Sequence, residues 1–125
     1  GEFDEAGRST VVVESKRLDD ALETHPADIG FIWVDSQGHE AHILDGAPRL
    51  LRHSIPWVIE YWPYGLARSG GLERLHDLIE EHFGPVVDVR ESLRREKVVA
   101  VSKNDLVRAA SVMGTDHTDL ILLPR

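Results

Sequence analysis

Two apolar runs, each closing near a carboxylate, constrain the fold of this chain more than any other feature. The first run is DIGFIWVD, residues 28–35, and the second is IPWVIEYWP, residues 55–63. A nearly continuous apolar run is typical of a strand that is buried on both faces, as in a parallel sheet covered by helices. The two runs therefore predict an α/β fold with a mostly parallel sheet.

The remaining segments alternate between strand and helix patterns, which is typical of one α/β domain. Further strands are expected at 10–15 (TVVVES), 85–90, 97–102 and 119–124. Helices are expected at 17–25, from 39 to a stop at Gly46, from Pro48, at 70–84 and, after a capping box, at 103–113. The charged segment RESLRREK, residues 90–97, is expected to be a solvated loop.

The composition fits a folded domain that binds neither nucleic acid nor membrane. The chain has 125 residues and a formal net charge of −8, which opposes contact with phosphate backbones and anionic lipids. It has no cysteine, which excludes disulfides and thiol nucleophiles. The apolar runs are too short to span a membrane and no signal peptide is seen, so a cytoplasmic location is expected. Residues 1–3 (GEF) resemble those that a cloning vector adds and carry no structural weight.

Two acids are the candidate functional residues. Asp35 directly follows the first run, so it is expected at the carboxyl edge of the sheet, where open α/β sheets bind ligands. Glu60 lies inside the second run, where a buried carboxylate is costly unless it is paired or hydrogen-bonded. Ordinary alternatives exist, since aspartate also suits turns and helix caps and Glu60 can be wet at the end of its strand. The functional hypothesis is a pair of acids that orients an acceptor or takes its proton.

The segment HEAH, residues 39–42, looks like a zinc-protease helix, but its spacing argues against a metal. The zinc motif needs two histidines four residues apart, with a glutamate next to the first. Here His39 and His42 are three apart, and nothing in the spacing of the other histidines selects a third ligand. We therefore expect no metal site, and a helix start at which His39, Glu40 and His42 face solvent.

Aromatic residues gather near the two runs, and they admit two interpretations. They can pack in the core, which is the commoner role, or they can stack on a sugar or a base. The residues concerned are Trp33, Trp57, Tyr61, Trp62 and Tyr64.

Four segments together resemble the C-terminal half of an FkbM-type methyltransferase. That family carries the pattern tLDdl…idfiKiDvEGhE..vL.Ga…L, followed by a strand that ends in glutamate. The matching segments here are LDD (18–20), DIGFIWVDSQGHEAHILDGAPRLL (28–51), PWVIEYWP (56–63) and the closing DLILLP (119–124). The resemblance implies part of a Rossmann-like three-layer sandwich, and a single partial methyltransferase-like domain over residues 1–125.

The resemblance also implies site residues. The family's strand-end aspartate falls on Asp35, its glycine on Gly38, its helix-start glutamate on Glu40 and the glutamate of the next strand on Glu60. Catalytic roles are thus expected for Asp35, Glu60 and Glu40, and contacts to S-adenosylmethionine for Asp35, Gln37 and Gly38. Two positions depart, because Trp33 stands where the family has lysine and Gln37 where it has glutamate.

The implied function is that of an S-adenosylmethionine-dependent O-methyltransferase acting on a hydroxyl of a sugar or natural product. The glycine-rich turn that holds the cofactor in this family has no counterpart in the sequence, so residues 1–125 alone are expected to bind S-adenosylmethionine weakly or not at all and to be inactive. The alternative is a non-catalytic interaction or carbohydrate-binding module. We further expect TVVVES to lie parallel beside the strand at 29–34, or that strand edge to pair with a second chain in a homodimer.

Overall fold

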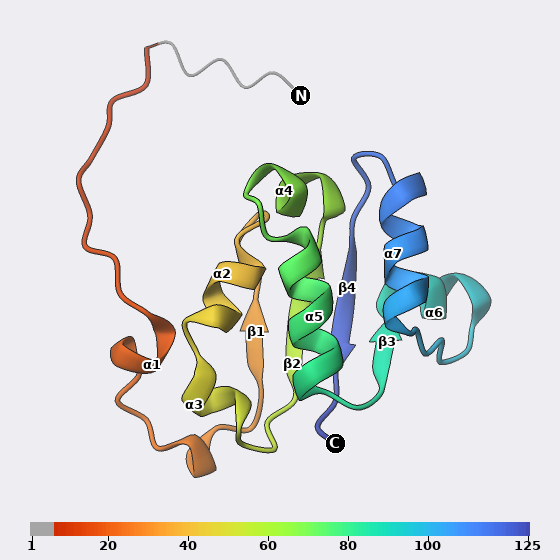
Figure 1. The fold of residues 1–125 in the computed structure, drawn as a ribbon, viewed down its shortest axis with the longest axis horizontal. Helices are drawn as coiled ribbons and strands as arrows, with labels where there is room; N and C mark the ends of the chain where they lie inside the picture. The colour runs from red at the N-terminus through yellow and green to blue at the C-terminus, as the bar shows by residue number, and fades with distance from the viewer. Residues whose placement is uncertain (1–6) are drawn as a thin grey trace.

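The computed structural model describes residues 7–125, and their regular elements alternate between helix and strand (Figure 1). In chain order they are α1 (Leu18–Ala21), a 3-10 turn (Pro26–Asp28), β1 (Ile32–Val34), α2 (Glu40–Asp45), α3 (Pro48–Leu51), β2 (Trp57–Tyr61), α4 (Pro63–Arg68), α5 (Leu72–His82), β3 (Val86–Asp88), α6 (Val89–Arg95), α7 (Lys103–Val112) and β4 (Thr118–Leu122). The α/β class is confirmed.

The four strands form one mixed sheet in the order β1-β2-β4-β3. β1 and β2 are parallel, whereas β4 runs antiparallel to both β2 and β3. The expected mostly parallel sheet is therefore not confirmed within residues 7–125. The parallel pair brings the ends of the two apolar runs to the same edge of the sheet.

The helices α2, α4, α5 and α7 lie together on one face of the sheet (Figure 1). The core fills the space between this layer and the sheet, and its largest fully buried side chains include Trp57 and Tyr61 of β2. Both aromatics thus take the packing role, while Trp33 is 65% exposed. The helix at 70–84 is confirmed as α5, whose apolar stripe faces the core because its hydrophobic residues recur at helical spacing.

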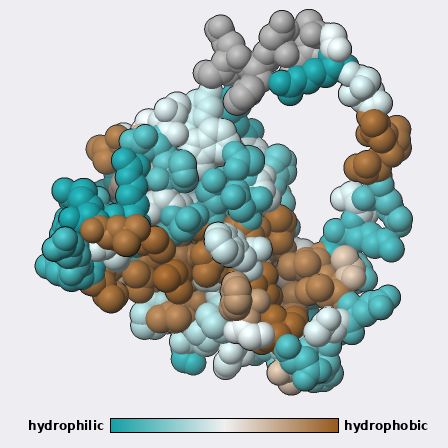
Figure 2. Space-filling view, turned by 180° about the vertical axis from the view of Figure 1, so that it is seen from behind, coloured by the Kyte–Doolittle hydropathy of each residue, from teal (hydrophilic) through white to brown (hydrophobic). Residues whose placement is uncertain are grey.

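The other face of the sheet carries an apolar row. Trp33 pairs with Val58, Val58 with Ile121, and Ile121 with Val87, so their side chains lie side by side across all four strands. Figure 2, seen from behind, shows an apolar band across this side of the molecule. The expected three-layer sandwich is not confirmed. The prediction that the 28–35 strand is buried on both faces is wrong, because Trp33 of β1 is 65% exposed while its neighbour Val34 is buried on the opposite face.

The prediction of a strand at 10–15 is wrong. The segment has no regular structure and its valines Val11, Val12 and Val13 are 78–100% exposed. β-branched residues favour a strand only where a neighbour and a packing surface are present, and neither is present here. Within the described part of the chain, β1 has β2 as its only strand neighbour. The parallel pairing of TVVVES with β1 is therefore excluded, whereas pairing with a second chain stays a prediction.

The charged segment 90–97 is also different from the prediction, because most of it belongs to α6. Asp88 caps this helix, since its Oδ1 accepts a hydrogen bond from Glu91 N at 3.0 Å. The strand expected at 97–102 reduces to a single bridge between Val87 and Ala100. The helix at 103–113 is confirmed as α7, and its capping box between Ser102 and Asp105 forms as expected. No helix found in residues 7–125 has the length and apolar character needed to cross a membrane.

Candidate active site

Asp35 and Glu60 lie next to each other at the carboxyl edge of the parallel pair. The register aligns Val34 of β1 with Ile59 of β2, so the residues that follow, Asp35 and Glu60, are neighbours across the two strands. Asp35 is exposed, whereas Glu60 is only 7% exposed. The position of Asp35 agrees with the prediction from the sequence, and of the two alternatives left open for Glu60 the structure shows the buried one.

Gln37 bridges these two acids. Its Nε2 donates a hydrogen bond to Asp35 Oδ1 at 2.9 Å and a longer one to Glu60 Oε2 at 3.4 Å. The backbone of Gln37 has a φ of 54°, which is in the left-handed region. With this backbone conformation the side-chain amide of Gln37 lies between the two carboxylates.

Glu40 holds the loop that follows β1. Its Oε1 accepts a hydrogen bond from Ser36 N at 2.8 Å, and its Oε2 accepts one from Gly38 N at 3.0 Å. The prediction that Glu40 faces solvent is wrong, because the residue is 0% exposed. Free N–H groups lie in the turn before a helix, and a carboxylate in the first helical turn can reach back to them, which is the signal that sequence reasoning missed.

Gly38 is packed against the backbone of Gly65 in α4. A Cβ on Gly38 would lie 2.6–2.9 Å from three backbone atoms of Gly65, and Gly38 also has a φ of 99°. Ser69 Oγ donates a hydrogen bond to the carbonyl of Gly38 at 2.6 Å. The loop after β1 is thereby fixed to the helix after β2, and sequence reasoning identified neither Gly65 nor Ser69.

Three carboxylates meet at this point. Asp35, Glu40 and Glu60 can each place one oxygen within 4.8 Å of the others. Burial raises the pKa of the Glu60 carboxyl, and the charges of Asp35 and Glu40 raise it further. Glu60 Oε1 is buried and has no hydrogen-bond partner. The site therefore concentrates negative charge where a proton, a cation or a hydrogen-bond donor would be stabilised.

The two histidines near Glu40 do not join it. Nε2 of His42 lies 3.0 Å from the carbonyl oxygen of Ser69, and the rings of His39 and His42 are 5.7 Å apart. Both histidines are exposed, as expected, whereas the Glu40 carboxylate turns inward. The geometry thus separates the members of the zinc-like motif.

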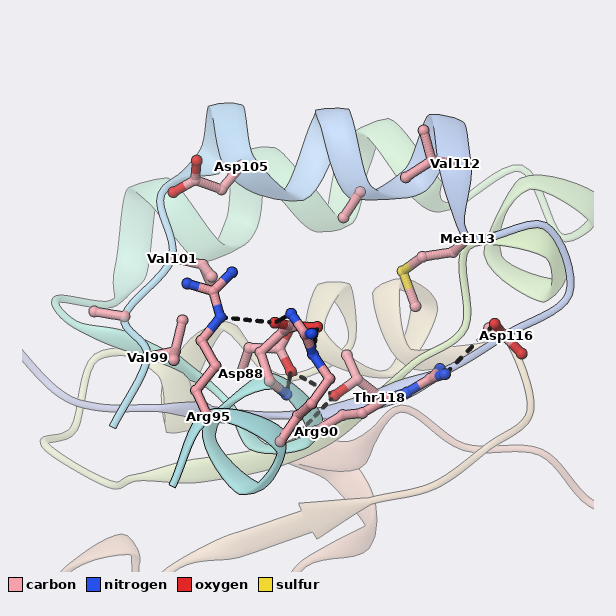
Figure 3. Close-up of a pocket in the computed structure, with 14 residues that line it drawn as sticks. Asp88, Arg90, Arg95, Val99, Val101, Asp105, Val112, Met113, Asp116 and Thr118 are labelled. Carbon is pink, nitrogen blue, oxygen red and sulfur yellow. Dashed lines mark hydrogen bonds and ion pairs between the residues drawn. The ribbon is translucent and has the colours of Figure 1, made fainter. Parts of the chain in front are cut away.

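A groove of about 640 Å³ lies near the opposite edge of the sheet, between α6 and α7 (Figure 3). Its arginines are already paired with acids: Arg94 and Arg95 with Glu91, and Arg90 with Asp116. The groove is therefore not a ready site for an anion. None of the sequence-predicted site residues lines it.

Comparisons with known proteins agree with the geometry of the loop after β1. The model of the family described as "Methyltransferase FkbM domain" matches residues 2–94, a range that contains Asp35, Gln37, Gly38, Glu40 and Glu60. Comparison with curated proteins and with solved structures gives no match. The family model covers well over half of the chain, and the chain therefore belongs to the FkbM methyltransferase domain family.

Proposed function

We propose that this chain is the C-terminal part of an S-adenosylmethionine-dependent O-methyltransferase that acts on a hydroxyl of a sugar or natural product. The observation that carries the proposal is the pair of carboxylates, Asp35 and Glu60, at the carboxyl edge of β1 and β2. Ligands of open α/β sheets bind at this edge. Membership of the FkbM family supports methyl transfer as the reaction.

The residues of this chain would orient the acceptor hydroxyl and remove its proton. The cofactor, when bound, supplies the methyl group to the acceptor oxygen and leaves as S-adenosylhomocysteine. Glu60 is the better candidate for the base, because burial raises the pKa of its carboxyl and so makes its carboxylate a stronger base than an ordinary one. Exposed Asp35 would orient the acceptor hydroxyl. Glu40 contacts the backbone of its own loop and is a positioning residue.

The expected cofactor contacts fit only in part. The side chains of Asp35 and Gln37 are exposed and can hydrogen-bond the amino or hydroxyl groups of S-adenosylmethionine. Gly38 does not offer an open backbone, because Gly65 fills the space on its Cα side and Glu40 takes its N–H. Two side-chain contacts make a weak site, which supports the expectation that residues 1–125 alone bind the cofactor poorly.

Two measurements test the proposal. Calorimetric titration of residues 1–125 with S-adenosylmethionine should give no micromolar Kd, and such a Kd would show that the cofactor site is misplaced. The protein encoded by the entire reading frame should transfer labelled methyl groups to hydroxyl acceptors. Glu60→Gln should lower kcat by about 100-fold, whereas Glu23→Gln, an exposed acid with the same charge change, should not. Equal rates in both variants would remove Glu60 from the mechanism.

A second candidate function is a non-catalytic interaction module, and the apolar row on the open face of the sheet favours it. A row that includes Trp33, Val58 and Ile121 is a surface on which a partner can pack. This function predicts that Trp33→Ser abolishes partner binding and that the reading-frame protein transfers no methyl group. A methyltransferase whose activity survives in Trp33→Ser would exclude it.

A further inference from the structure

The acids of the candidate active site have little matching positive charge, although a charged His117 lowers the pKa of the Glu60 carboxyl. Within residues 7–125, no lysine or arginine forms an ion pair with Asp35, Glu40 or Glu60. Their hydrogen-bond donors are the neutral amide of Gln37 and the backbone N–H groups of Ser36 and Gly38. Three carboxylates at this separation repel one another in a partly buried site, and neutral donors offset only part of that cost.

The Glu60 carboxyl provides a second and separate observation. The residue is 93% buried, being 7% exposed, and its Oε1 has no partner although the atom is shielded from solvent. A buried polar atom without a partner is costly, so native proteins rarely keep one unless a water, a ligand or an ion completes it. Glu60 belongs to the same three-carboxylate cluster as Asp35, so a ligand of the Glu60 carboxylate would lie close to the Asp35 carboxylate.

The donor set selects the kind of ligand. All the charged groups are carboxylates, and oxygen donors suit hard cations such as Mg²⁺, Mn²⁺ and Ca²⁺. These ions bind oxygen at roughly 2.0–2.6 Å, so oxygens on opposite sides of one ion lie about 4–5 Å apart. The carboxylate oxygens here lie within 4.8 Å of one another, which matches that span.

We propose that Asp35 and Glu60 bind one hard divalent cation at the carboxyl edge of β1 and β2. Glu40 already uses each oxygen once to hold the loop, so it contributes mainly negative potential and the position of Asp35. The exposed side of Asp35 leaves room for water or an acceptor hydroxyl. This proposal replaces the expectation of no metal, which concerned only the spacing of His39, Glu40 and His42.

The cation would also give the site a catalytic device. A hydroxyl that reaches a divalent cation loses its proton more easily, so the same two acids that hold the ion would sit beside a more reactive oxygen. This role rests on the proposed function, whereas cation binding does not. Binding is therefore measured without cofactor or acceptor, so that failure of one proposal does not decide the other.

The test uses residues 1–125 near pH 7.5, titrated separately with Mg²⁺, Mn²⁺ and Ca²⁺ by calorimetry, and with Tb³⁺ by luminescence excited through tryptophan. We expect saturable binding of one ion per chain, with a Kd between about 10 μM and 1 mM for at least one of the three divalent ions. Asp35→Asn and Glu60→Gln should each weaken binding by about tenfold or more. Asp20→Asn is the matched control, because Asp20 is exposed and outside the cluster, and it should bind as the unchanged chain does.

Two results would overturn the site. One is the absence of saturable binding up to about 10 mM of all three ions, which would mean that a shared proton alone relieves the acids. The other is binding that both Asp35→Asn and Glu60→Gln leave unchanged. Circular dichroism of each variant confirms that the comparison is between folded proteins. If a chelator does not affect methyl transfer by the protein encoded by the entire reading frame, the cation has no catalytic role, although the binding site can still exist.

Discussion

The hydroxyl of Tyr61 lies 2.7 Å from Nε2 of His76, in the core between β2 and α5. The same hydroxyl donates a hydrogen bond to the carbonyl of Leu106 at 2.9 Å. Because the hydroxyl hydrogen goes to Leu106, Nε2 of His76 must carry the hydrogen of the other bond. Two buried hydrogen bonds through one hydroxyl thus connect β2, α5 and α7.

Removing this hydroxyl should destabilise the protein. Tyr61→Phe leaves a buried N–H of His76 and a buried carbonyl of Leu106 without their partner, which costs about 1–3 kcal/mol of the free energy of unfolding. Tyr64→Phe is the control, because its hydroxyl meets only the exposed Arg68. Urea denaturation measures both variants. Equal stabilities would show that the two buried hydrogen bonds contribute nothing.

The buried His76 should also make the free energy of unfolding depend on pH. Burial lowers the pKa of His76 below its ordinary value of 6.5, so the unfolded chain binds this proton more readily than the folded one. The free energy of unfolding should therefore fall as the pH falls below about 6.5. Denaturation between pH 5 and 8 should show this slope, and His76→Gln should reduce it. Exposed His53→Gln should leave it intact, and a slope that survives in His76→Gln would contradict the assignment.

Glu60 should give the free energy of unfolding a pH dependence opposite in sign to that of His76. Its pKa is raised above 4.5, so the folded protein holds this proton more strongly and loses stability as the pH rises through the raised pKa. Glu60→Gln removes that loss and should stabilise the protein at pH 7.5 by about 0.5–2 kcal/mol. The gain should shrink as the pH falls towards 4.5, because the unfolded chain then binds this proton as well and the difference between the two states narrows. A destabilised Glu60→Gln at pH 7.5 in the absence of added cations would show that the carboxylate is already compensated.

The contact between Gly38 and Gly65 should tolerate no side chain. Gly38→Ala combines a left-handed φ with a Cβ that overlaps backbone, and we expect a loss of about 2–5 kcal/mol. Gly70→Ala is a close control, because Gly70 has a φ of 79° and open space around it, so only the backbone cost of about 1–2 kcal/mol remains. Thermal or urea unfolding of the two variants separates overlap from strain. Similar losses would mean that the loop moves aside.

The sequence predicted the parts of this protein that depend on local pattern. The stripe of α5, the capping box of α7 and the stop at Gly46 all follow from residues a few positions apart. Asp88, three residues before Glu91, was a comparable cap signal for α6, and the high charge of the segment concealed it. The segment 10–15, with its three valines, did not form the predicted strand, because a strand also needs a neighbouring strand that no local pattern supplies.

Local sequence patterns predicted only part of the candidate site. A carboxylate after an apolar run and another inside the next run indicated Asp35 and Glu60. Their closeness depends on the parallel register of β1 and β2, which is a long-range property. The inward turn of Glu40 depends on the shape of the loop, in which Gln37 and Gly38 have positive φ and the N–H groups of Ser36 and Gly38 point to the Glu40 carboxylate.

The contact of Gly38 with Gly65 also decides which part of the site can move. The loop that carries Asp35 and the helix that follows Glu60 touch backbone to backbone, and Ser69 ties them further, so they should shift as one rigid body and keep the two acids at a constant separation. The exposed amide of Gln37 is free of that restraint. One rotating side chain, rather than a moving loop, would then open or close the space between the carboxylates.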